Sequence, residues 1–304
     1  IITDTAHRKA RILDIKADRM LAELEMGRVL IVAGFQGVTT DAEETTLGRG
    51  GSNLTAVALA YALGADVCEM NTDVDGIYTA DPRVVPDARK LDLVTPEEML
   101  EMAGAGARVL QSRSVEFAEK YGVTIAVRSS FNEKPGTLIK ETEEMEEVLV
   151  RSVAHELDAA KITVRHVTDR PGIAAKLFGL LAQRDINVDM IIQNTSEAGS
   201  TDVSFTVQNE DLDKALDVCS GVQKELGAEE VVSDSDIAKV SVVGVGMKSH
   251  AGVAANMFEA LATANINIHM ISTSEIKISV VVREADVEPA VRALHDAFQL
   301  AAVS

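Results

Sequence analysis

The chain has 304 residues, enough for two or three domains, and its hydrophobic fraction of 46% is that of an ordinary globular protein. Its formal net charge of −19 argues against nucleic acid and anionic membranes as partners, because both are bound by basic surfaces. There is no apolar run near ~20 residues, no signal-peptide pattern, and no metal-ligand spacing between Cys68 and Cys219, so we predict a cytoplasmic protein with reduced thiols and no metal centre.

Strands and helices alternate along the first 140 residues. The predicted elements are a helix at 17–26, a buried strand at 29–33, a helix at 54–63, a strand at 67–71, helices at 96–103 and 109–120, and a strand at 124–127. Such alternation is typical of a mostly parallel sheet covered by helices on both faces. Ligands of these sheets bind at the carboxyl ends of the strands. The loops 34–53 and 71–83 both follow strands, so we expect them to line one crevice.

The sequence from Thr46 to Asn53 reads TLGRGGSN and directly precedes the helix predicted at 54–63. Its three glycines permit tight turns and close approach to a ligand, and the start of a helix attracts an anion. Arg49 adds a planar group suited to carboxylate or phosphate. No Gly-Lys-Ser/Thr follows, so the loop is not a P-loop. It predicts a site for an anionic small molecule, while an ordinary turn capped by Ser52 or Asn53 is the alternative.

A second loop, residues 72–83, reads TDVDGIYTADPR. Counted from Asp73, the glycine is the fourth residue of the loop, whereas a calcium-binding EF-hand loop has it sixth and ends in Glu. No Glu ends this loop, so the sequence argues against an EF-hand. The loop's acidic, aromatic and arginine side chains suit a nucleotide, and a plain turn with an Asp–Arg pair fits equally well. The glycines at 104 and 106, before Arg108, indicate either a further phosphate cradle or close helix packing.

The acidic run 140–147 predicts a solvated linker, and we place a domain boundary there. Beyond it the chain repeats itself at a constant offset. The matched pairs are Gly172 with Gly252, Phe178 with Phe258, Asn187 with Asn267, and Met190 with Met270. Each copy predicts β-α-β-β-α, with its polar junction residues serving either as helix caps or as ligand contacts.

The two copies differ in how they end. The first closes with a strand at 229–233, whereas the second has almost no chain left for one. An unassigned strand at 148–153 is available to fill that place. We therefore predict interleaved modules with these boundaries: a first domain at 1–140, a linker at 141–147, one module at 157–235, and another at 148–156 plus 236–304.

Taken together, these segments resemble aspartate kinase over essentially the whole chain. The resemblance rests on AGFQG at 33–37, TTLGRGGS at 45–52, the loop 72–83, RSVE at 113–116, RSSF at 128–131, GMKSH at 246–250 and ISTSE at 271–275. It implies an α/β fold: a partial amino-acid-kinase three-layer sandwich with a mostly parallel sheet, followed by two interleaved ferredoxin-like βαββαβ ACT domains.

The resemblance also implies an activity, which is transfer of phosphate from ATP with Mg²⁺ to the side-chain carboxylate of L-aspartate. This is the first step of lysine, threonine and methionine biosynthesis. Lysine, threonine or both would inhibit through the ACT domains, which would also mediate self-association. Catalysis of such a transfer is mostly positioning and neutralisation of charge. Two alternatives are a kinase of another amino acid, such as glutamate, and a non-catalytic amino-acid sensor.

Family positions carry over residue by residue onto this sequence. The implied aspartate site comprises Phe35, Arg49, Gly50, Gly51 and Ser52. The implied ATP site comprises Ser52, Asn71, Thr72, Asp73, Ile77, Tyr78, Thr79, Ala80, Asp81, Pro82, Arg83 and Arg108. The implied effector sites comprise Asp169, Arg170, Pro171, Gly172, Ile173, Ala174, Asn187, Val188, Asp189, Gln193, Val253, Ala254, Asn267, Ile268, Ser274 and Glu275.

The sequence departs from the family pattern in two ways. The family begins with a Lys-Phe-Gly-Gly-Thr-Ser type segment, whose lysine stabilises the transferring phosphoryl group. This chain begins at Ile1 without it, so we expect that an N-terminal segment is missing and that the chain as given is inactive alone. Asn53 stands where the family usually has Asp, and Asn71, Arg108 and Gln111 replace the usual Tyr, Lys and His.

Overall fold

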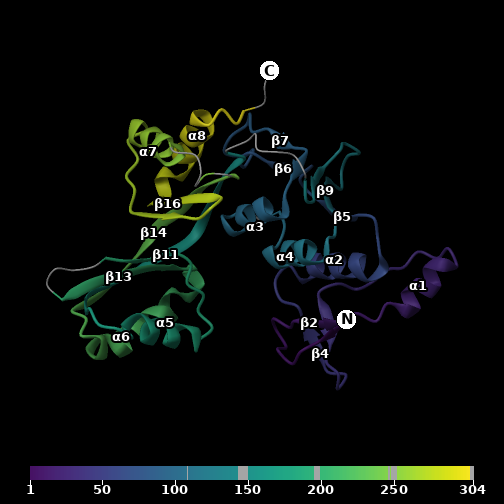
Figure 1. Ribbon diagram of the computed structural model, residues 1–304, viewed down its shortest axis with the longest axis horizontal. Helices are drawn as coiled ribbons and strands as arrows, with labels where there is room; N and C mark the ends of the chain where they lie inside the picture. Colours follow the sequence, from purple (N-terminus) through teal and green to yellow (C-terminus); the bar gives the residue numbers. More distant parts are fainter. Residues whose placement is uncertain (108, 143–149, 195–198, 246, 248–251, 302–304) are drawn as a thin grey trace.

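The structure is a computed structural model that describes residues 1–107, 109–142, 150–194, 199–245, 247 and 252–301. Two lobes lie side by side, the N-terminal one in purple to blue and the C-terminal one in teal to yellow (Figure 1). Some predictions fall on residues outside this described set. They concern Arg108, most of the acidic linker, the first two residues of the strand at 148–153 and most of the GMKSH segment.

The N-terminal lobe carries two small sheets. One has the order β2-β1-β3-β4, with β1 (Ile2–Thr3), β2 (Ile12–Asp14), β3 (Gln36–Val38) and β4 (Glu44–Thr46). The other has the order β5-β9-β10-β8, with β5 (Cys68–Thr72), β8 (Leu93–Val94), β9 (Ile125–Ser129) and β10 (Thr137–Ile139). A hairpin joins β6 (Ile77–Tyr78) to β7 (Lys90–Leu91), and the helices are α1 (Asp18–Glu25), α2 (Gly51–Leu63), α3 (Pro96–Gly104) and α4 (Ser112–Tyr121).

Local sequence explains where α3 begins. Thr95 accepts a hydrogen bond from the Glu98 N–H, and the Glu98 carboxylate accepts one from the Thr95 N–H, which makes a capping box. Pro96 occupies the first turn, where its missing N–H costs nothing. The start of α3 is therefore fixed within a few residues, and its buried face joins the core beneath β5 and β9.

The α/β class is confirmed, and one detail of the expectation is corrected. The second sheet is mostly parallel as expected, because β5–β9 and β8–β10 pair parallel while β9–β10 pair antiparallel. The run at 29–33 is not a buried strand, since Val29 is 91% exposed and Ile31 is 98% exposed. An apolar run becomes a strand only beside a partner, and no described strand pairs with it.

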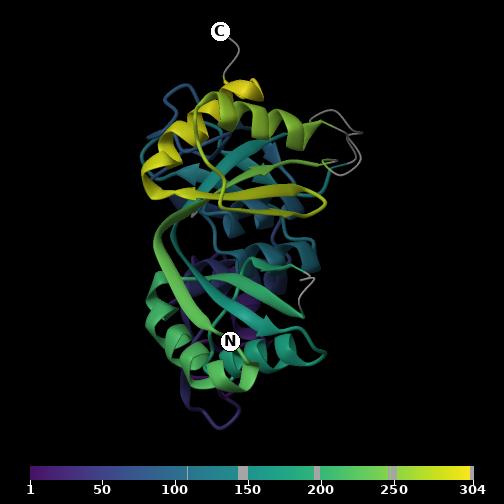
Figure 2. The ribbon, with the colours of Figure 1, turned by 90° about the vertical axis from the view of Figure 1, so that its left-hand side faces the viewer.

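The C-terminal lobe is one six-stranded sheet of order β12-β13-β11-β14-β16-β15 (Figure 2). Its strands are β11 (Ser152–Thr168), β12 (Ile191–Gln193), β13 (Ser200–Val207), β14 (Glu230–Val243), β15 (Met270–Thr273) and β16 (Lys277–Arg283). Its helices are α5 (Ile173–Ala182), α6 (Leu212–Leu226), α7 (Val253–Thr263) and α8 (Val287–Ala297), with short 3₁₀ turns at Asn209–Asp211 and Glu284–Asp286.

Two long strands, β11 and β14, run through both ACT modules. The start of β11 pairs with the end of β14, as in Ser152 with Val243, and the end of β11 pairs with the start of β14, as in Arg165 with Glu230. The sequence predicted separate strands in each module, whereas the structure joins them. Register shifts near Ala159 let the strands bend without breaking the ladder. This pairing confirms two interleaved modules, and the exact domain boundaries stay a prediction.

The two lobes are joined along one face of α3. Arg151 Nε lies 3.1 Å from Glu98 Oε1, Lys277 Nζ lies 2.7 Å from Glu101 Oε2, and Lys239 Nζ lies 3.4 Å from the Gly104 carbonyl. Apolar residues of the loop after β6, including Val84 and Val85, also belong to the core formed by β14, β16, α7 and α8. The N-terminal and C-terminal lobes therefore share a hydrophobic core and ion pairs.

We expect Arg151→Met to lower the free energy of unfolding by roughly 2–4 kcal/mol, because it leaves the Glu98 carboxylate, only 1% exposed, without its cation. Urea denaturation measures the change. Lys277→Met is the matched control, since its carboxylate partner Glu101 is 27% exposed and its loss should cost less than about 1.5 kcal/mol. Equal costs for the two variants would contradict the difference in burial.

Candidate active site

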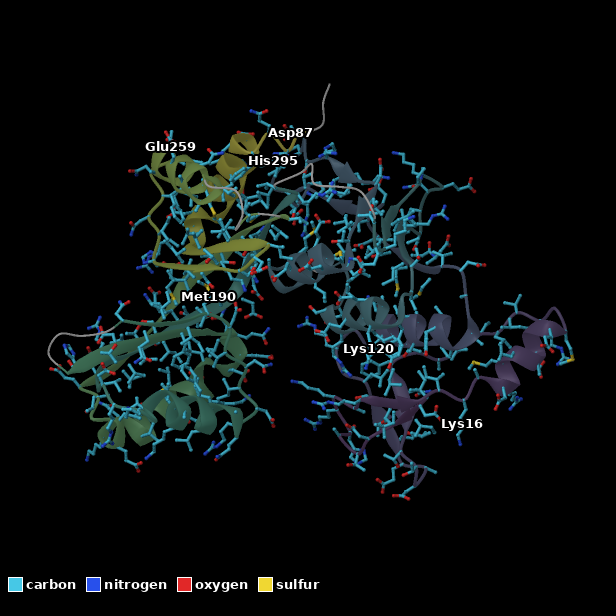
Figure 3. The ribbon with its side chains drawn as sticks, viewed as in Figure 1. Lys16, Asp87, Lys120, Met190, Glu259 and His295 are labelled. Atoms are coloured by element: carbon cyan, nitrogen blue, oxygen red, sulfur yellow. The ribbon has the colours of Figure 1, made fainter. Side chains whose placement is uncertain are left out.

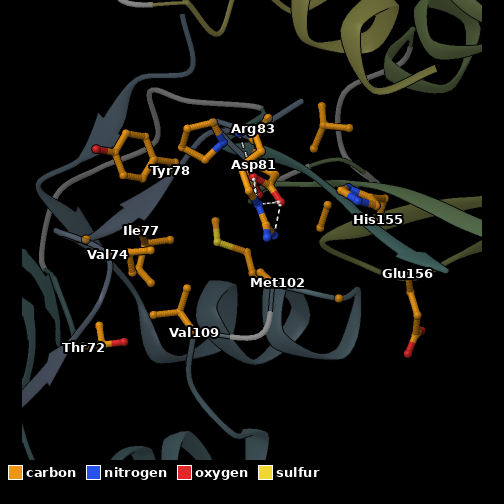
Figure 4. A pocket seen from close by; sticks show the side chains of 18 of the residues that line it. Thr72, Val74, Ile77, Tyr78, Asp81, Arg83, Met102, Val109, His155 and Glu156 are labelled. Carbon is orange, nitrogen blue, oxygen red and sulfur yellow. Dashed lines mark hydrogen bonds and ion pairs between the residues drawn. The ribbon is translucent and has the colours of Figure 1, made fainter. Parts of the chain in front are cut away.

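A cavity of about 600 Å³ lies between the lobes (Figure 4). Its walls come from the loop after β5, from the connection between α3 and α4, and from the start of β11. The lining residues are Thr72, Asp73, Val74, Gly76, Ile77, Tyr78, Ala80, Asp81, Pro82, Arg83, Met102, Gly106, Ala107, Val109 and 152–157. Most of the residues expected around ATP therefore line one cavity.

Charge at the cavity rim comes from Asp81 and Arg83. Arg83 Nη2 lies 2.7 Å from Asp81 Oδ2, and Arg83 Nε also donates to Asp81 Oδ1 at 3.1 Å. The hydrogen bond from Arg83 lowers the pKa of Asp81 below its ordinary value, while burial opposes this shift. The Asp–Arg pair of the plain-turn alternative is thus present. It lies at the mouth of a cavity, with the guanidinium 90% exposed and open to an anion.

The hairpin that carries this loop is held by hydrogen bonds. Tyr78 Oη donates to Asp75 Oδ1 at 2.6 Å, and this bond, together with burial, raises the pKa of Tyr78 to about 12. The Ile77 N–H donates to Thr137 Oγ1 at 2.8 Å. The phenol therefore stays protonated near neutral pH, and the aromatic wall of the cavity is fixed in position (Figure 4).

Thr79 is fully buried behind the cavity, at the junction with α8. Its hydroxyl donates to the Leu300 carbonyl at 3.2 Å and accepts the Arg89 N–H at 2.9 Å. His295 Nε2 lies 3.0 Å from the same oxygen (His295 is labelled in Figure 3). Because the one hydroxyl proton is used on Leu300, Nε2 must donate, so Nε2 carries the ring proton. His295 Nδ1 then has no hydrogen-bond partner among the described residues.

We expect the chain to lose stability as pH falls from 6.5 towards 5. Burial lowers the pKa of His295, with Asp87 and Asp296 opposing the shift, so the unfolded state takes up the proton first. Stability is therefore full above the unfolded pKa of ~6.5 and is lost below it. One such histidine contributes a slope of up to about 1.4 kcal/mol per pH unit.

Urea denaturation between pH 7.5 and 5 tests this dependence with His295→Gln, whose amide does not titrate. We expect a shallower slope in the variant. A slope remains, because burial lowers the pKa of His155 and of His269 as well. Parallel curves for the two proteins would rule out His295 as the titrating group.

A second cavity of about 390 Å³ adjoins the first, since Thr72 and Val109 line both. It is lined by Ser52, Asn53, Glu69, Met70, Asn71, Thr72, Val109 and Leu110. Ser52 and Asn71, both expected at the ATP site, therefore lie on this side. Asn53 presents an amide to this cavity where the family pattern has a carboxylate.

The glycine-rich loop begins α2 without a side-chain cap. Gly50 is the N-cap, with φ 72°, and the helix starts at Gly51. The alternative of a loop capped by Ser52 or Asn53 is therefore wrong. A Cβ on Gly50 would lie 1.8 Å from Gln111 Cγ, so only glycine fits here. No side chain caps α2, but the Gly51 N–H donates to the Gly48 carbonyl at 2.9 Å and the Asn53 N–H to the Gly50 carbonyl at 3.0 Å. What suits an anion here is therefore the positive end of the helix dipole.

Phe35 and Arg49 complete this end of the site. Phe35 packs against Gly51, with Cδ2 3.1 Å from the position of a Gly51 Cβ, and its N–H donates to Thr55 Oγ1 at 3.1 Å. Arg49 is exposed. Arg113 of α4 donates to the carbonyls of Leu47 at 2.6 Å and Ala10 at 3.0 Å, which holds the loop from below. The residues expected to bind aspartate therefore lie together at the start of α2.

The expected effector residues fall into two groups at opposite ends of the six-stranded sheet. The first group lies at the start of α5, in the segments before and after that helix, and at the end of the edge strand β12. The second lies at the start of α7, in the connection from α7 to the edge strand β15, and directly after β15. Gly172 and Gly252 are the equivalent N-caps of α5 and α7, both in the left-handed region. Met190 and Met270, which follow the two groups' polar segments, belong to one buried cluster with Ala159, Ile237 and Val281.

Sequence reasoning missed the cavity-wall residues 152–157, of which His155 and Glu156 carry ionisable side chains. They lie on β11 of the C-terminal lobe. Polar and apolar residues are mixed along this stretch, so the sequence does not single out His155 and Glu156. In the described part of the chain, no group of three or more His, Cys, Asp or Glu is placed to hold a metal, and no helix is long and apolar enough to cross a membrane.

Comparison with known proteins places this fold and site in a class. The model of the amino acid kinase family matches residues 1–129, and an ACT-domain model matches residues 162–222 and 240–298. An aspartate kinase of Stutzerimonas stutzeri is 57% identical over 302 residues, which are 99% of this chain and 73% of that protein. An aspartokinase of Pseudomonas aeruginosa is 56% identical over 303 residues, covering 99% and 74%.

Solved structures agree with the sequence matches. Escherichia coli aspartokinase III with aspartate and ADP, in the R-state, has a TM-score of 0.79 at 32% identity, covering 97% of this chain and 67% of that one. The same enzyme with lysine and aspartate, in the T-state, has a TM-score of 0.73 at 32% identity, covering 98% and 67%. The fold and site define an amino acid kinase domain joined to tandem ACT domains. The chain belongs to the aspartate kinase family.

Proposed function

We propose that this chain carries the nucleotide site, part of the aspartate site and the regulatory domain of an enzyme that phosphorylates the side-chain carboxylate of L-aspartate with ATP. The observation that carries the proposal is the pair of adjoining cavities. One is walled by the loop 72–83 and the other lies at the start of α2. The ADP and aspartate bound by the E. coli relative support this assignment.

The chemistry joins two anions, so the chain's task is positioning and neutralisation. An oxygen of the aspartate side chain attacks the γ-phosphorus, the bond from phosphorus to the β–γ bridging oxygen breaks, and ADP leaves. No protein base is needed, because the attacking carboxylate is already ionised. Arg49 and the positive end of α2 would hold aspartate, while Arg83 at the cavity rim would meet the nucleotide.

Mg²⁺ fits this site as a companion of ATP. Among the carboxylates near the cavity, Asp81 is paired with Arg83, Glu156 with Lys239, and Asp75 accepts from Tyr78. Asp73 accepts only the Thr72 hydroxyl, at 2.9 Å, and has no cationic partner in the described part of the chain. Mg²⁺ usually takes one or two carboxylates and completes its shell with water and substrate phosphates. In the bound state it would neutralise phosphate charge, with Asp73 as the residue to hold it.

We further propose feedback inhibition by lysine, threonine or both at the ACT segments, with self-association through these domains. The lysine-bound T-state of the E. coli relative supports lysine as one effector.

Substrate-dependent release of ADP tests the activity on the full-length encoded protein. We expect L-aspartate, and not L-glutamate, to drive release. Release with L-glutamate would replace the proposed substrate. Calorimetry with L-lysine and L-threonine, with and without the ATP analogue AMP-PNP, separates an enzyme from an amino-acid sensor. Binding of both effectors without any binding of AMP-PNP would favour the sensor.

A further inference from the structure

Lys239 of β14 is a buried cation that the proposed reaction does not use. The residue is only 4% exposed. Its Nζ lies 2.9 Å from Glu156 Oε2, 2.5 Å from Asp189 Oδ2 and 3.4 Å from the Gly104 carbonyl. An ammonium has three donors, so this one is fully used by three acceptors that belong to three different parts of the chain.

Each acceptor leads to a different part of the molecule. Asp189 lies in the expected effector segment 187–189. Glu156 lines the large cavity from β11 (Figure 4). Gly104 is the last residue of α3, two residues before Gly106, which also lines the cavity. One side chain therefore joins the effector segment to two walls of the nucleotide cavity.

The ammonium holds its charge in this position. Burial alone would lower the pKa of Lys239, but Glu156 and Asp189 outweigh it, so the pKa is raised. A buried charge that loses a partner costs several kcal/mol unless it finds another. Loss of one contact must therefore be met by a move of Lys239 or of its remaining partners, and this is a mechanical link rather than a proton switch.

We propose that Lys239 is a positioning residue that couples effector binding at residues 187–189 to nucleotide affinity. The inference rests on the proposed effector and nucleotide sites. An amino-acid effector brings its own ammonium, which competes with Lys239 for Asp189. Lys239 is then held by Glu156 and Gly104 alone, and its shift alters both cavity walls. Coupling of this kind is reciprocal, so nucleotide must change effector affinity by the same factor.

Lys277 provides a matched control, because its partner Glu101 lies on α3, the same helix that Lys239 contacts at Gly104. Lys277 of β16 pairs with Glu101, one turn before Gly104, at 2.7 Å. It ties the regulatory sheet to α3 just as Lys239 does, yet its ion pair with Glu101 does not involve the segment 187–189. A purely structural tie between lobes would make the two lysines equivalent, whereas a relay would not.

The test measures the ratio of the dissociation constants of AMP-PNP with and without saturating L-lysine, and separately with L-threonine, by calorimetry on the full-length protein. Allosteric coupling typically gives a factor of about 5–150 in wild type. We expect Lys239→Met to bring this ratio within about twofold of unity. Lys277→Met should keep the wild-type ratio, and Lys239→Arg should restore part of it.

A wild-type ratio in a folded Lys239→Met protein would overturn the relay. If that variant does not fold, Glu156→Leu decides, because an apolar side chain cannot accept from the ammonium and Asp189 stays paired with Lys239. A ratio unchanged in Glu156→Leu would equally overturn it. If the ratio in wild type is unity with L-lysine and with L-threonine, the proposed effector role itself is wrong, and the proposed relay is wrong with it. The two failures are thereby distinguished.

Discussion

Arg49→Ala is expected to weaken L-aspartate binding by roughly 30–150-fold, or about 2–3 kcal/mol, which is the scale of charge-assisted hydrogen bonds. Arg49 is exposed and follows a left-handed Gly48, just before the uncapped start of α2. Arg49→Lys keeps the charge but loses the planar fork, so we expect an intermediate loss. Calorimetry with L-aspartate in the presence of AMP-PNP measures both.

The same experiment separates the two cavities. The affinity for AMP-PNP alone should change by less than about twofold in Arg49→Ala, because the expected nucleotide residues line the other cavity. Arg19→Ala, an exposed arginine on α1, is the charge-matched control and should leave both affinities unchanged. An aspartate affinity within twofold of wild type in Arg49→Ala would remove Arg49 from the substrate site.

Local patterns predicted the helices and the loop 72–83 well, whereas the stretch 34–53, expected as one loop, holds β3, β4 and the first residues of α2. The start of α3 depends on the capping box of Thr95 and Glu98, and the end of α2 depends on Gly64. Because these signals involve only neighbouring residues, both helix limits are close to those expected. The loop 72–83 follows β5 and lines the large cavity as a loop at the carboxyl end of a strand should.

Features that depend on distant partners could not be predicted in this way. The run at 29–33 has the composition of a buried strand, but composition does not supply a neighbour to pair with. The joining of predicted short strands into β11 and β14 depends on pairing between residues far apart, such as Arg165 with Glu230. His155 and Glu156 enter the cavity only because β11 passes α3, and no local pattern encodes that approach.

The approach of β11 to the end of α3 also sets the second large effect. A Cβ on Gly106 would lie 1.9 Å from the His155 carbonyl oxygen and 2.7 Å from its carbon. Gly106 also has φ +111°, a conformation that side-chain-bearing residues rarely adopt. We expect Gly106→Ala to lower the free energy of unfolding by at least about 3 kcal/mol, from backbone strain and overpacking together.

Gly64→Ala is the matched control, because Gly64 has φ +62° at the end of α2 and nothing lies within 4 Å of its Cβ position. It should cost only the strain of a left-handed residue, about 1–2 kcal/mol. Urea denaturation compares the two variants, and AMP-PNP calorimetry adds the functional side. Since His155 and Gly106 wall the same cavity, forcing them apart should weaken nucleotide binding in Gly106→Ala and not in Gly64→Ala. Equal effects of both variants would mean that β11 does not press on this glycine, and that the regulatory strand does not shape the nucleotide cavity.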